Sequence, residues 1–230
     1  DVSKPGTFTE ALRGAHALFL MRPPTAGAAE VNPVVDAAQA AGVRRIAFLS
    51  VLGADKNPLL PHRATERHID KARLDAVFLR AAYFMQNLSE VHADDVRRGD
   101  LSVPAGTGRT SLVDAHDVAD VAAHWLTSGE RGQSGLDLTG PEALDMFQVA
   151  RILSDVTGRR VDYRRPGVVQ FVRERLGAGD GLAFALVMSG LYTATRLGFA
   201  DRVTDTVEQV LGRPATSFRE WAEDAREAWT

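Results

Sequence analysis

Short apolar runs alternate with helix-periodic segments along the first part of the chain. Residues 16–21 (HALFLM) form an apolar run that ends before a pair of prolines, which is typical of a strand covered on both faces. Residues 31–43 then have the spacing of an amphipathic helix. The same order recurs in a strand-like run at 44–50, a helical segment at 64–74 and a strand-like run at 75–84. This alternation predicts an α/β fold with a doubly wound parallel sheet.

The chain becomes mostly helical after about residue 146. Helical patterns also fill 84–99 and 114–129, and residues 135–140 (GLDLTG) form a short strand-like run. We therefore expect residues 1–145 to hold the sheet and residues 146–230 to form a mainly helical subdomain over the strand ends, where open α/β sheets bind ligands. The helices expected in the second part cover 146–158, 168–177 and 181–199, with a strand-like segment at 159–166.

The glycine-rich turn that usually holds a pyrophosphate in such sheets is not recognisable. Gly106 and Gly108 in PAGTGRTS give only G-x-G, with no long strand before it and no helix directly after it, so a surface turn is the better interpretation. The chain begins instead with DVSKPGTFTEALRG, where we expect Ser3 or Thr7 to cap a short helix.

Composition limits the partners that need to be considered. The 230 residues carry 27 basic and 30 acidic side chains without a long run of one sign, so neither nucleic acid nor a membrane surface is an expected partner. The absence of cysteine excludes disulfides and thiolate metal sites. The longest uncharged apolar stretch, 181–195, is shorter than the ~20 residues of a membrane-spanning helix. We expect a cytoplasmic protein, in which the apolar helix around 184–192 forms a pocket wall or a homodimer interface.

Several polar residues have a structural interpretation. Asp114 and Asp117 are expected to cap the helix VADVAAHWL. The histidines do not show a metal-ligand spacing such as H-E-x-x-H, so no metal is expected; they are His62, His68, His92, His116 and His124.

An ordered series of motifs resembles one known family. The motifs are HALFLMRPP, AGVRRIAFLSVLGAD, FLRAAYFMQN, GTGRTSLVDAHDVADVAA and GLDLTGPEALDMFQVARILSDVTGRRVDY. Over residues 1–165 they are similar to the NmrA-like branch of the atypical short-chain dehydrogenases, which includes NAD(P)H-dependent quinone oxidoreductases. The resemblance implies a Rossmann-like NAD(P)-binding domain in residues 1–145 and a substrate-covering subdomain in residues 146–230.

One departure from the family is large. The family's opening strand, glycine-rich turn, helix and second strand have no counterpart here, which would leave strand 16–21 with an unpaired apolar edge. We therefore expect a sequence that is truncated at its start. The alternative is a complete protein whose edge is covered by a dimer partner or by a rearrangement.

The resemblance implies NADP or NAD as the cofactor, bound at the carboxyl ends of the strands. Met21, Arg22, Pro23 and Pro24 end the first strand where the dinucleotide's ribose would pass, although the prolines would also simply stop the strand. Ser50 ends the next strand, where it would bond a substrate or cofactor oxygen or merely cap the turn.

The segment after the third strand supplies a second group of candidates. The resemblance places Tyr83, Phe84, Met85 and Asn87 against the nicotinamide and the substrate. Core packing is the alternative interpretation, mainly for Phe84 and Met85.

The catalytic Tyr-x-x-x-Lys pair of the larger short-chain dehydrogenase group is absent. By position, His62 takes the place of the tyrosine and Glu66 that of the lysine, with Asp70 one turn further along the same face. In the catalytic interpretation, His62 has a pKa near neutrality and bonds a carbonyl or donates a proton. In the alternative, His62 and Glu66 pair on a solvated helix. We expect Ser50, His62, Tyr83 and Asn87 to converge on one cleft.

Two functions therefore remain open. One is an NAD(P)H-dependent oxidoreductase that acts on a quinone or another small carbonyl compound, since the cofactor carries the difficult chemistry. The other is a non-catalytic NAD(P)-sensing regulator that binds a protein partner.

We predict that the 230-residue chain binds NADPH and NADH poorly. The main partners of the pyrophosphate are the N–H groups of the glycine-rich turn and the helix dipole behind it. Loss of several charge-assisted hydrogen bonds at ~1.5–3 kcal/mol each moves a micromolar site into the millimolar range. Calorimetric titration measures this, and an added upstream strand, Gly-x-x-Gly-x-x-Gly turn and helix should restore binding. Micromolar affinity of the unextended chain would contradict the prediction.

Overall fold

The computed structural model describes residues 4–23, 26–129 and 133–229. The chain forms two compact units that are interleaved along the sequence, and each is described by itself. Unit 1 consists of Asp1–Ala81 and Val118–Leu138, and unit 2 of Ala82–Asp117 and Thr139–Thr230. Among the helices of the described ranges, none has the length and apolarity to cross a membrane. The functional division into residues 1–145 and 146–230 stays a prediction.

Unit 1 is built on a parallel sheet. Within the described residues its strands are β1 (Ala17–Met21), β2 (Arg45–Val51), β3 (Asp75–Ala81) and β6 (Gln133–Leu138), in the order β1-β2-β3-β6. Leu20 lies beside Phe48, and Phe48 beside Phe78, so apolar side chains adjoin across the strands. The predicted strands and the parallel α/β fold are therefore confirmed.

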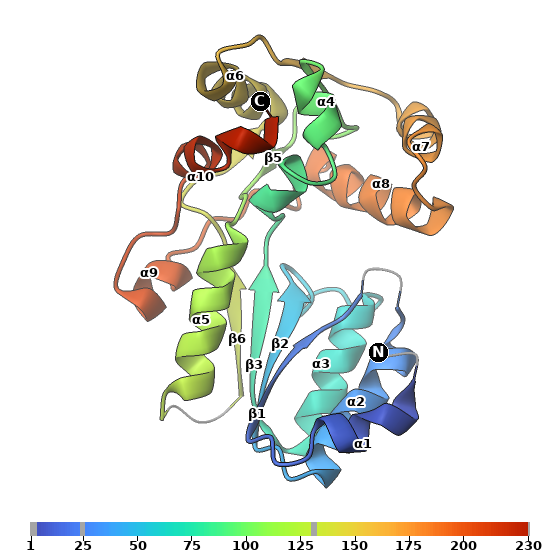
Figure 1. The fold of residues 1–230 in the computed structure, drawn as a ribbon, viewed down its shortest axis with the longest axis vertical. Coiled ribbons are helices and arrows are strands. Elements are labelled where there is room, and N and C mark those ends of the chain that lie inside the picture. The colour runs from blue at the N-terminus through green and yellow to red at the C-terminus, as the bar shows by residue number, and fades with distance from the viewer. Residues whose placement is uncertain (1–3, 24–25, 130–132, 230) are drawn as a thin grey trace. The chain divides into compact units, whose positions relative to one another are not determined.

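Helices cover both faces of this sheet. The helices of unit 1 are α1 (Phe8–Ala11), α2 (Ala28–Ala40), α3 (Pro61–Ala72) and most of α5 (Ala115–Thr127). Helices α2 and α3 lie on one side of the sheet and α5 on the other (Figure 1). Phe48 packs with Ile69 of α3, while Val77 and Leu79 are buried on the opposite face. Burial on both faces explains the continuous apolar runs 46–49 of β2 and 76–79 of β3, whereas β1, also predicted to be covered on both faces, is exposed at Phe19 and Met21.

Strand β1 lies at an edge of the sheet. Among the described residues it pairs only with β2. Phe19 and Met21 on this strand are 44% and 57% exposed. An exposed apolar edge of this kind favours pairing with a further strand.

The cap predicted at the start of the first helix is wrong for Thr7. A 3₁₀ turn, η1 (Pro5–Thr7), precedes α1, and the Thr7 hydroxyl donates to the carbonyl of Lys4 at 2.8 Å instead of accepting from the helix. Ser3, the other predicted cap, lies outside the described residues.

Unit 2 is mainly helical around its own core. The core holds the fully buried rings of Phe171, Tyr192, Phe218 and Trp229. Strand β4 pairs with β8 in parallel, and β5 pairs with β7 in antiparallel orientation. Its elements are η2 (Met85–Leu88), α4 (Ala93–Arg97), β4 (Asp100–Ser102), β5 (Arg109–Thr110), β7 (Leu144–Asp145), α6 (Met146–Thr157), β8 (Asp162–Arg164), α7 (Val168–Gly177), α8 (Leu182–Arg196), α9 (Thr206–Leu211), α10 (Phe218–Asp224) and η3 (Arg226–Trp229).

The helices predicted after residue 146 are present as α6, α7 and α8, but the helix predicted over 84–99 is wrong. Phe84 forms a parallel bridge with Val113, and the N–H of Met85 donates to the Val113 carbonyl at 3.0 Å. This pairing holds the start of the segment extended. Only a 3₁₀ turn, η2, and the short helix α4 follow.

The turn containing Gly106 and Gly108 packs against the end of α8. A Cβ on Gly108 would lie 2.0 Å from the carbonyl oxygen of Thr195 and 2.8 Å from the Cα of Arg196. Backbone atoms cannot move aside as a flexible side chain can, so this close approach requires glycine.

We predict that Gly108→Ala destabilises the protein by about 1–3 kcal/mol, because the added methyl group overpacks the contact with α8. Gly177→Ala is the matched control, since its Cβ meets nothing within 4 Å at the end of α7. Alanine there should be neutral or stabilise by up to about 1 kcal/mol. Urea unfolding curves measure both variants, and equal stability of the two would contradict the prediction.

Candidate functional site

Helix α3 carries the candidates His62 and Glu66. Pro61 occupies its first turn, where the missing N–H costs nothing, and the helix ends at Arg73 in the left-handed conformation. His62 and Glu66 lie four residues apart and therefore share one face of the helix. That face packs against the sheet of unit 1, since Glu66 is fully buried.

The buried carboxylate of Glu66 joins α3 to two strands. Arg80 of β3 donates to it with two nitrogens, each at 3.0 Å. The Ser50 hydroxyl at the end of β2 donates at 2.7 Å, and Arg63 donates at 3.0 Å. Glu66 is therefore a structural centre and does not pair with His62 on a solvated surface, which corrects that alternative.

The charges of this cluster stabilise each other. Burial alone would raise the pKa of Glu66, but the hydrogen bonds from Arg80, Ser50 and Arg63 and the charge of Arg80 hold it below its usual value. Burial alone would lower the pKa of Arg80, whereas Glu66, with Asp55 and Asp137, raises it. At neutral pH the cluster is thus a fully ionised pair.

His62 does not have the near-neutral pKa that its catalytic interpretation requires. Burial and then the positive charge of Arg22 lower the pKa of His62 to about 4, although Glu66 acts in the opposite direction. Its Nδ1 atom is buried and has no hydrogen-bond partner among the described residues. At neutral pH the ring is uncharged, so His62 is suited to a hydrogen bond and not to donation from an imidazolium. Its catalytic role stays a prediction.

The residues that end β1 have different surroundings. Met21 is exposed, and Pro23 is partly buried. A guanidinium nitrogen of Arg22 donates to the carbonyl of Ala26, and burial lowers the pKa of Arg22. Pro24 lies outside the described residues. Their contact with a dinucleotide stays a prediction.

In unit 2, Tyr83 belongs to a buried polar chain. Its phenol oxygen lies 2.6 Å from that of Tyr192, which in turn lies 2.6 Å from Nε2 of His92. Phe84 and Asn87 are partly buried, and Met85 is a core residue. Burial raises the pKa of the Tyr83 phenol, against the opposing effects of Tyr192, Arg175 and Asn87.

The two predicted caps of α5 have different roles. Asp114 accepts from the N–H of His116 at 3.0 Å and is a helix cap, as predicted. Asp117 instead binds the loop before α10, where it accepts from Arg213 at 2.6 Å and from the N–H of Thr216 at 2.7 Å. The prediction that Asp117 is a cap is therefore wrong.

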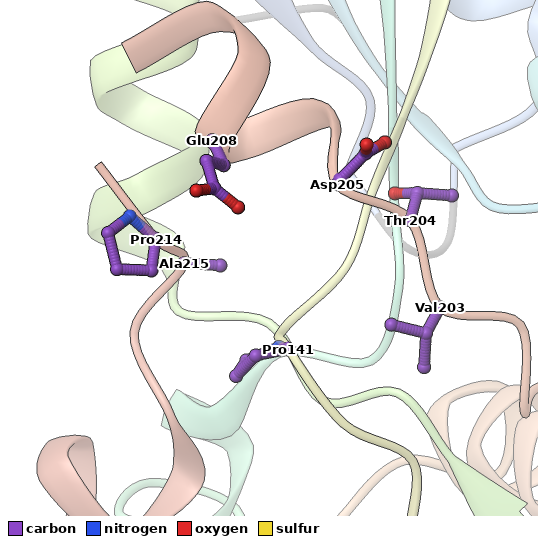
Figure 2. A pocket seen from close by; sticks show the side chains of 7 residues that line it. All are labelled: Pro141, Val203, Thr204, Asp205, Glu208, Pro214 and Ala215. Atoms are coloured by element: carbon purple, nitrogen blue, oxygen red, sulfur yellow. The ribbon is translucent and has the colours of Figure 1, made fainter. Parts of the chain in front are cut away.

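A surface pocket of unit 2 contains none of the predicted site residues. Figure 2 shows Asp205 and Glu208, at the start of α9, on the side of the pocket opposite Pro141. The lining residues are Pro141, Val203, Thr204, Asp205, Glu208, Pro214 and Ala215. In the part of the chain that the structure describes, no group of side chains is arranged to hold a metal ion.

The predicted site residues divide between the units. Ser50 and His62 belong to unit 1, and Tyr83 and Asn87 to unit 2. Their convergence on one cleft stays a prediction. Within unit 1 the structure joins Ser50 to Glu66, and within unit 2 it joins Tyr83 to Tyr192.

The partners of these residues were not predicted from the sequence. Arg80 is a lone charge inside an apolar strand, and a buried lone charge requires a counter-ion such as Glu66. Tyr192 lies in an apolar helix, where a buried phenol requires a partner such as His92. Both signals indicate that a partner exists, but only the fold identifies it.

The parallel sheet of unit 1, covered by helices on both faces, defines a Rossmann-type α/β protein. The sequence matches the NmrA-like family over residues 1–221. The chain belongs to this family, which confirms the resemblance inferred from the motifs.

Characterised relatives cover almost the whole chain. The sequence is 31% identical to the NAD(P)H azoreductase of Xenophilus azovorans over 96% of this chain and 79% of that protein. It is 28% identical to quinone oxidoreductase 2 of Escherichia coli, over 96% of this chain and 79% of that protein. The crystal structure of the Escherichia coli quinone oxidoreductase QOR2 with NADPH has the same fold, with a TM-score of 0.86 at 24% identity over 97% of this chain and 81% of that one.

We predict that Glu66→Gln destabilises the protein by about 3–5 kcal/mol at pH 7, because the largely buried charge of Arg80 loses its hydrogen-bonded counter-ion and keeps the more distant Asp55, at 3.9 Å. The lowered pKa of Glu66 means that its contribution is present above the usual 4.5 and is lost as the pH falls through the lower folded value. The difference from wild type should therefore shrink in acid. Urea unfolding at several pH values measures it.

Asp155→Asn is the control for this variant. Asp155 pairs with Arg219 at 2.9 Å on the surface, where the side chains are 54% and 48% exposed. Its loss should cost at most about 1 kcal/mol. Similar losses in the two variants would show that the buried pair has no special role.

Proposed function

We propose that this protein is an NAD(P)H-dependent oxidoreductase that reduces a small quinone, carbonyl or azo compound. The observation that carries the proposal is the match to an NAD(P)H azoreductase over nearly the whole chain, at 31% identity. The similarity to a quinone oxidoreductase supports the same reaction class. In this class the cofactor supplies the hydride, and the protein supplies binding, orientation and proton transfer.

Residues at the ends of β1 and β2 and in the first turn of α3 offer groups of the kind that a dinucleotide requires, which supports the proposal. The buried Nδ1 atom of His62 has no partner within the described residues and remains available for a ligand hydrogen bond. Exposed Met21 offers apolar contact to a ribose or nicotinamide. Ser50 has committed its proton to Glu66, so its oxygen is left as an acceptor.

The proposed roles follow from these properties. Met21, Arg22 and Pro23 line the cofactor path, and Ser50 accepts a hydrogen bond from the cofactor or the substrate. In unit 2, Phe84 and Asn87 bind the nicotinamide end, and Tyr83 exchanges a proton with the substrate. His62 positions the reactants as a neutral hydrogen-bonding group.

An oxidation assay tests the proposal. The protein is mixed with a panel of quinones, aldehydes, ketones and azo dyes and with NADPH or NADH at millimolar concentration, because the chain is predicted to bind the cofactor weakly. Cofactor oxidation is followed by absorbance. We expect turnover with at least one acceptor. Dinucleotide binding measured by calorimetry, without turnover of any acceptor, would instead favour an NAD(P)-sensing regulator that acts on a protein partner.

A variant of Tyr83 tests whether the turnover depends on the proposed proton donor, which reduction by NADPH free in solution would not. Tyr83→Phe removes the phenol that would exchange the proton but keeps the ring. We expect it to lower the turnover number by about 10²-fold, a typical contribution of a positioned proton donor. Turnover that is unchanged in this variant would remove Tyr83 from the proposed site.

A further inference from the structure

A continuous chain of hydrogen bonds runs through unit 2 from Tyr83 to Asp95. Tyr83 Oη lies 2.6 Å from Tyr192 Oη, and Tyr192 Oη lies 2.6 Å from His92 Nε2. On the other side of the ring, His92 Nδ1 lies 3.2 Å from a carboxylate oxygen of Asp95. These contacts join the segment after β3 to α8 and to α4.

The two middle members of this chain are enclosed. His92 is 0% exposed and Tyr192 is 2% exposed, whereas Tyr83 is partly exposed. The Tyr192 ring packs at right angles on Phe171, with the ring centroids 5.6 Å apart. Tyr83 is therefore the end at which the chain meets solvent or a ligand.

The carboxylate of Asp95 assigns the tautomer of His92. A carboxylate only accepts, so in the neutral ring Nδ1 carries the proton and Nε2 accepts from Tyr192. Tyr192 then accepts from Tyr83, and the Tyr83 oxygen is left as an acceptor. When Nε2 is protonated the order of the two bonds reverses, and the Tyr83 hydroxyl is left as a donor.

We propose that His92 is a buried proton store for the reaction, and that Tyr192 and Tyr83 pass its proton to the substrate. This inference rests on the proposed function and extends it, because it names the residues that act behind Tyr83. His92 and Tyr192 are positioning residues, while Tyr83 is the catalytic residue that touches the substrate.

The proton transfer balances the reduction. Hydride from NAD(P)H adds to the acceptor and leaves a negative charge on its oxygen or nitrogen. The Tyr83 O–H bond breaks and its proton binds that atom, Tyr192 passes its proton to Tyr83, and the Nε2–H proton of the imidazolium passes to Tyr192. His92 becomes neutral, and after product release water returns one proton through the same phenols.

Burial and the neighbouring charged groups determine the pKa of His92. Burial, the largest effect, and the charge of Arg175 on α7 lower its pKa, while Asp95 and Asp180 raise it. Arg175 itself lies 3.8 Å from Asp95 and 2.5 Å from Asp180, which compensates much of its effect. A further titratable neighbour is the Tyr192 phenol on α8. Since the pKa lies below the usual 6.5, the charged form, and with it proton donation, is lost as the pH rises through that lowered value.

Single-turnover rates of NADPH oxidation at several pH values test the proposal with the acceptor that the wild-type protein turns over. The variants are His92→Gln, which keeps hydrogen bonding but cannot store a proton, and Tyr192→Phe, which breaks the chain and keeps the ring. We expect both to lose about 10²-fold in rate and to lose the rise of the rate toward acid pH, with half-maximal rate at a similar acceptor concentration. His116→Gln is the control, because that side chain is 85% exposed.

The tautomer and the titration of His92 give a readout that does not depend on activity. Nitrogen-15 NMR of the imidazoles in the free protein should show His92 as the Nδ1–H form at pH 7.5, with a titration below 6.5 that Tyr192→Phe displaces. The His92→Gln spectrum assigns the signal, and circular dichroism confirms that each variant is folded. An Nε2–H tautomer would overturn the inference.

The outcomes separate the two proposals. If the wild-type protein does not oxidise NADPH in the presence of any acceptor of the panel, the proposed function is overturned, and the relay with it. A wild-type protein that is active, with variants that keep its pH profile and rate, overturns the relay alone. Loss of rate with an unchanged pH profile assigns His92 a purely structural role and also overturns it.

Discussion

A buried carboxylate, that of Glu66, fixes the part of unit 1 where the candidate residues lie. An ionised group inside a protein is tolerated only when its charge is compensated and its lone pairs accept hydrogen bonds. Glu66 meets both conditions through Arg80, Arg63 and Ser50. Helix α3 is thereby tied to the ends of β2 and β3, and the orientation of Ser50 follows from that bond.

In unit 2, a series of hydrogen bonds satisfies polar side chains of the core. Its buried polar groups, Tyr83, Tyr192 and His92, satisfy one another in series, and the series ends on a carboxylate at the edge of the unit. Because Tyr192 and His92 each have one partner on either side, a change of charge at His92 reverses the two bonds among Tyr83, Tyr192 and His92, while His92 Nδ1 donates to Asp95 in both states. A network of this kind rigidifies the core, and proton transfer along it is our proposal.

The lack of a Tyr-x-x-x-Lys pair is consistent with chemistry that the cofactor carries. The family membership is shown by the match over residues 1–221, and an NAD(P)H-dependent reduction is our proposal. In such a reaction the protein contributes orientation and one proton. His62, with a pKa of about 4, is uncharged at neutral pH. We therefore propose the phenol of Tyr83, and not His62, as the proton donor.

The sequence by itself determined the parallel α/β sheet, because strands buried on both faces are apolar on both faces and therefore stand out as runs such as 46–49 and 76–79. The motif series also determined the family. Only the tertiary structure decided that Glu66 is buried against Arg80 and that Tyr192 stands between Tyr83 and His92. These partners lie 14 to 109 positions apart, and no local pattern encodes such distances. A side chain's charge and pKa depend on the groups that folding brings to it, so the chemistry of the site was decided by packing.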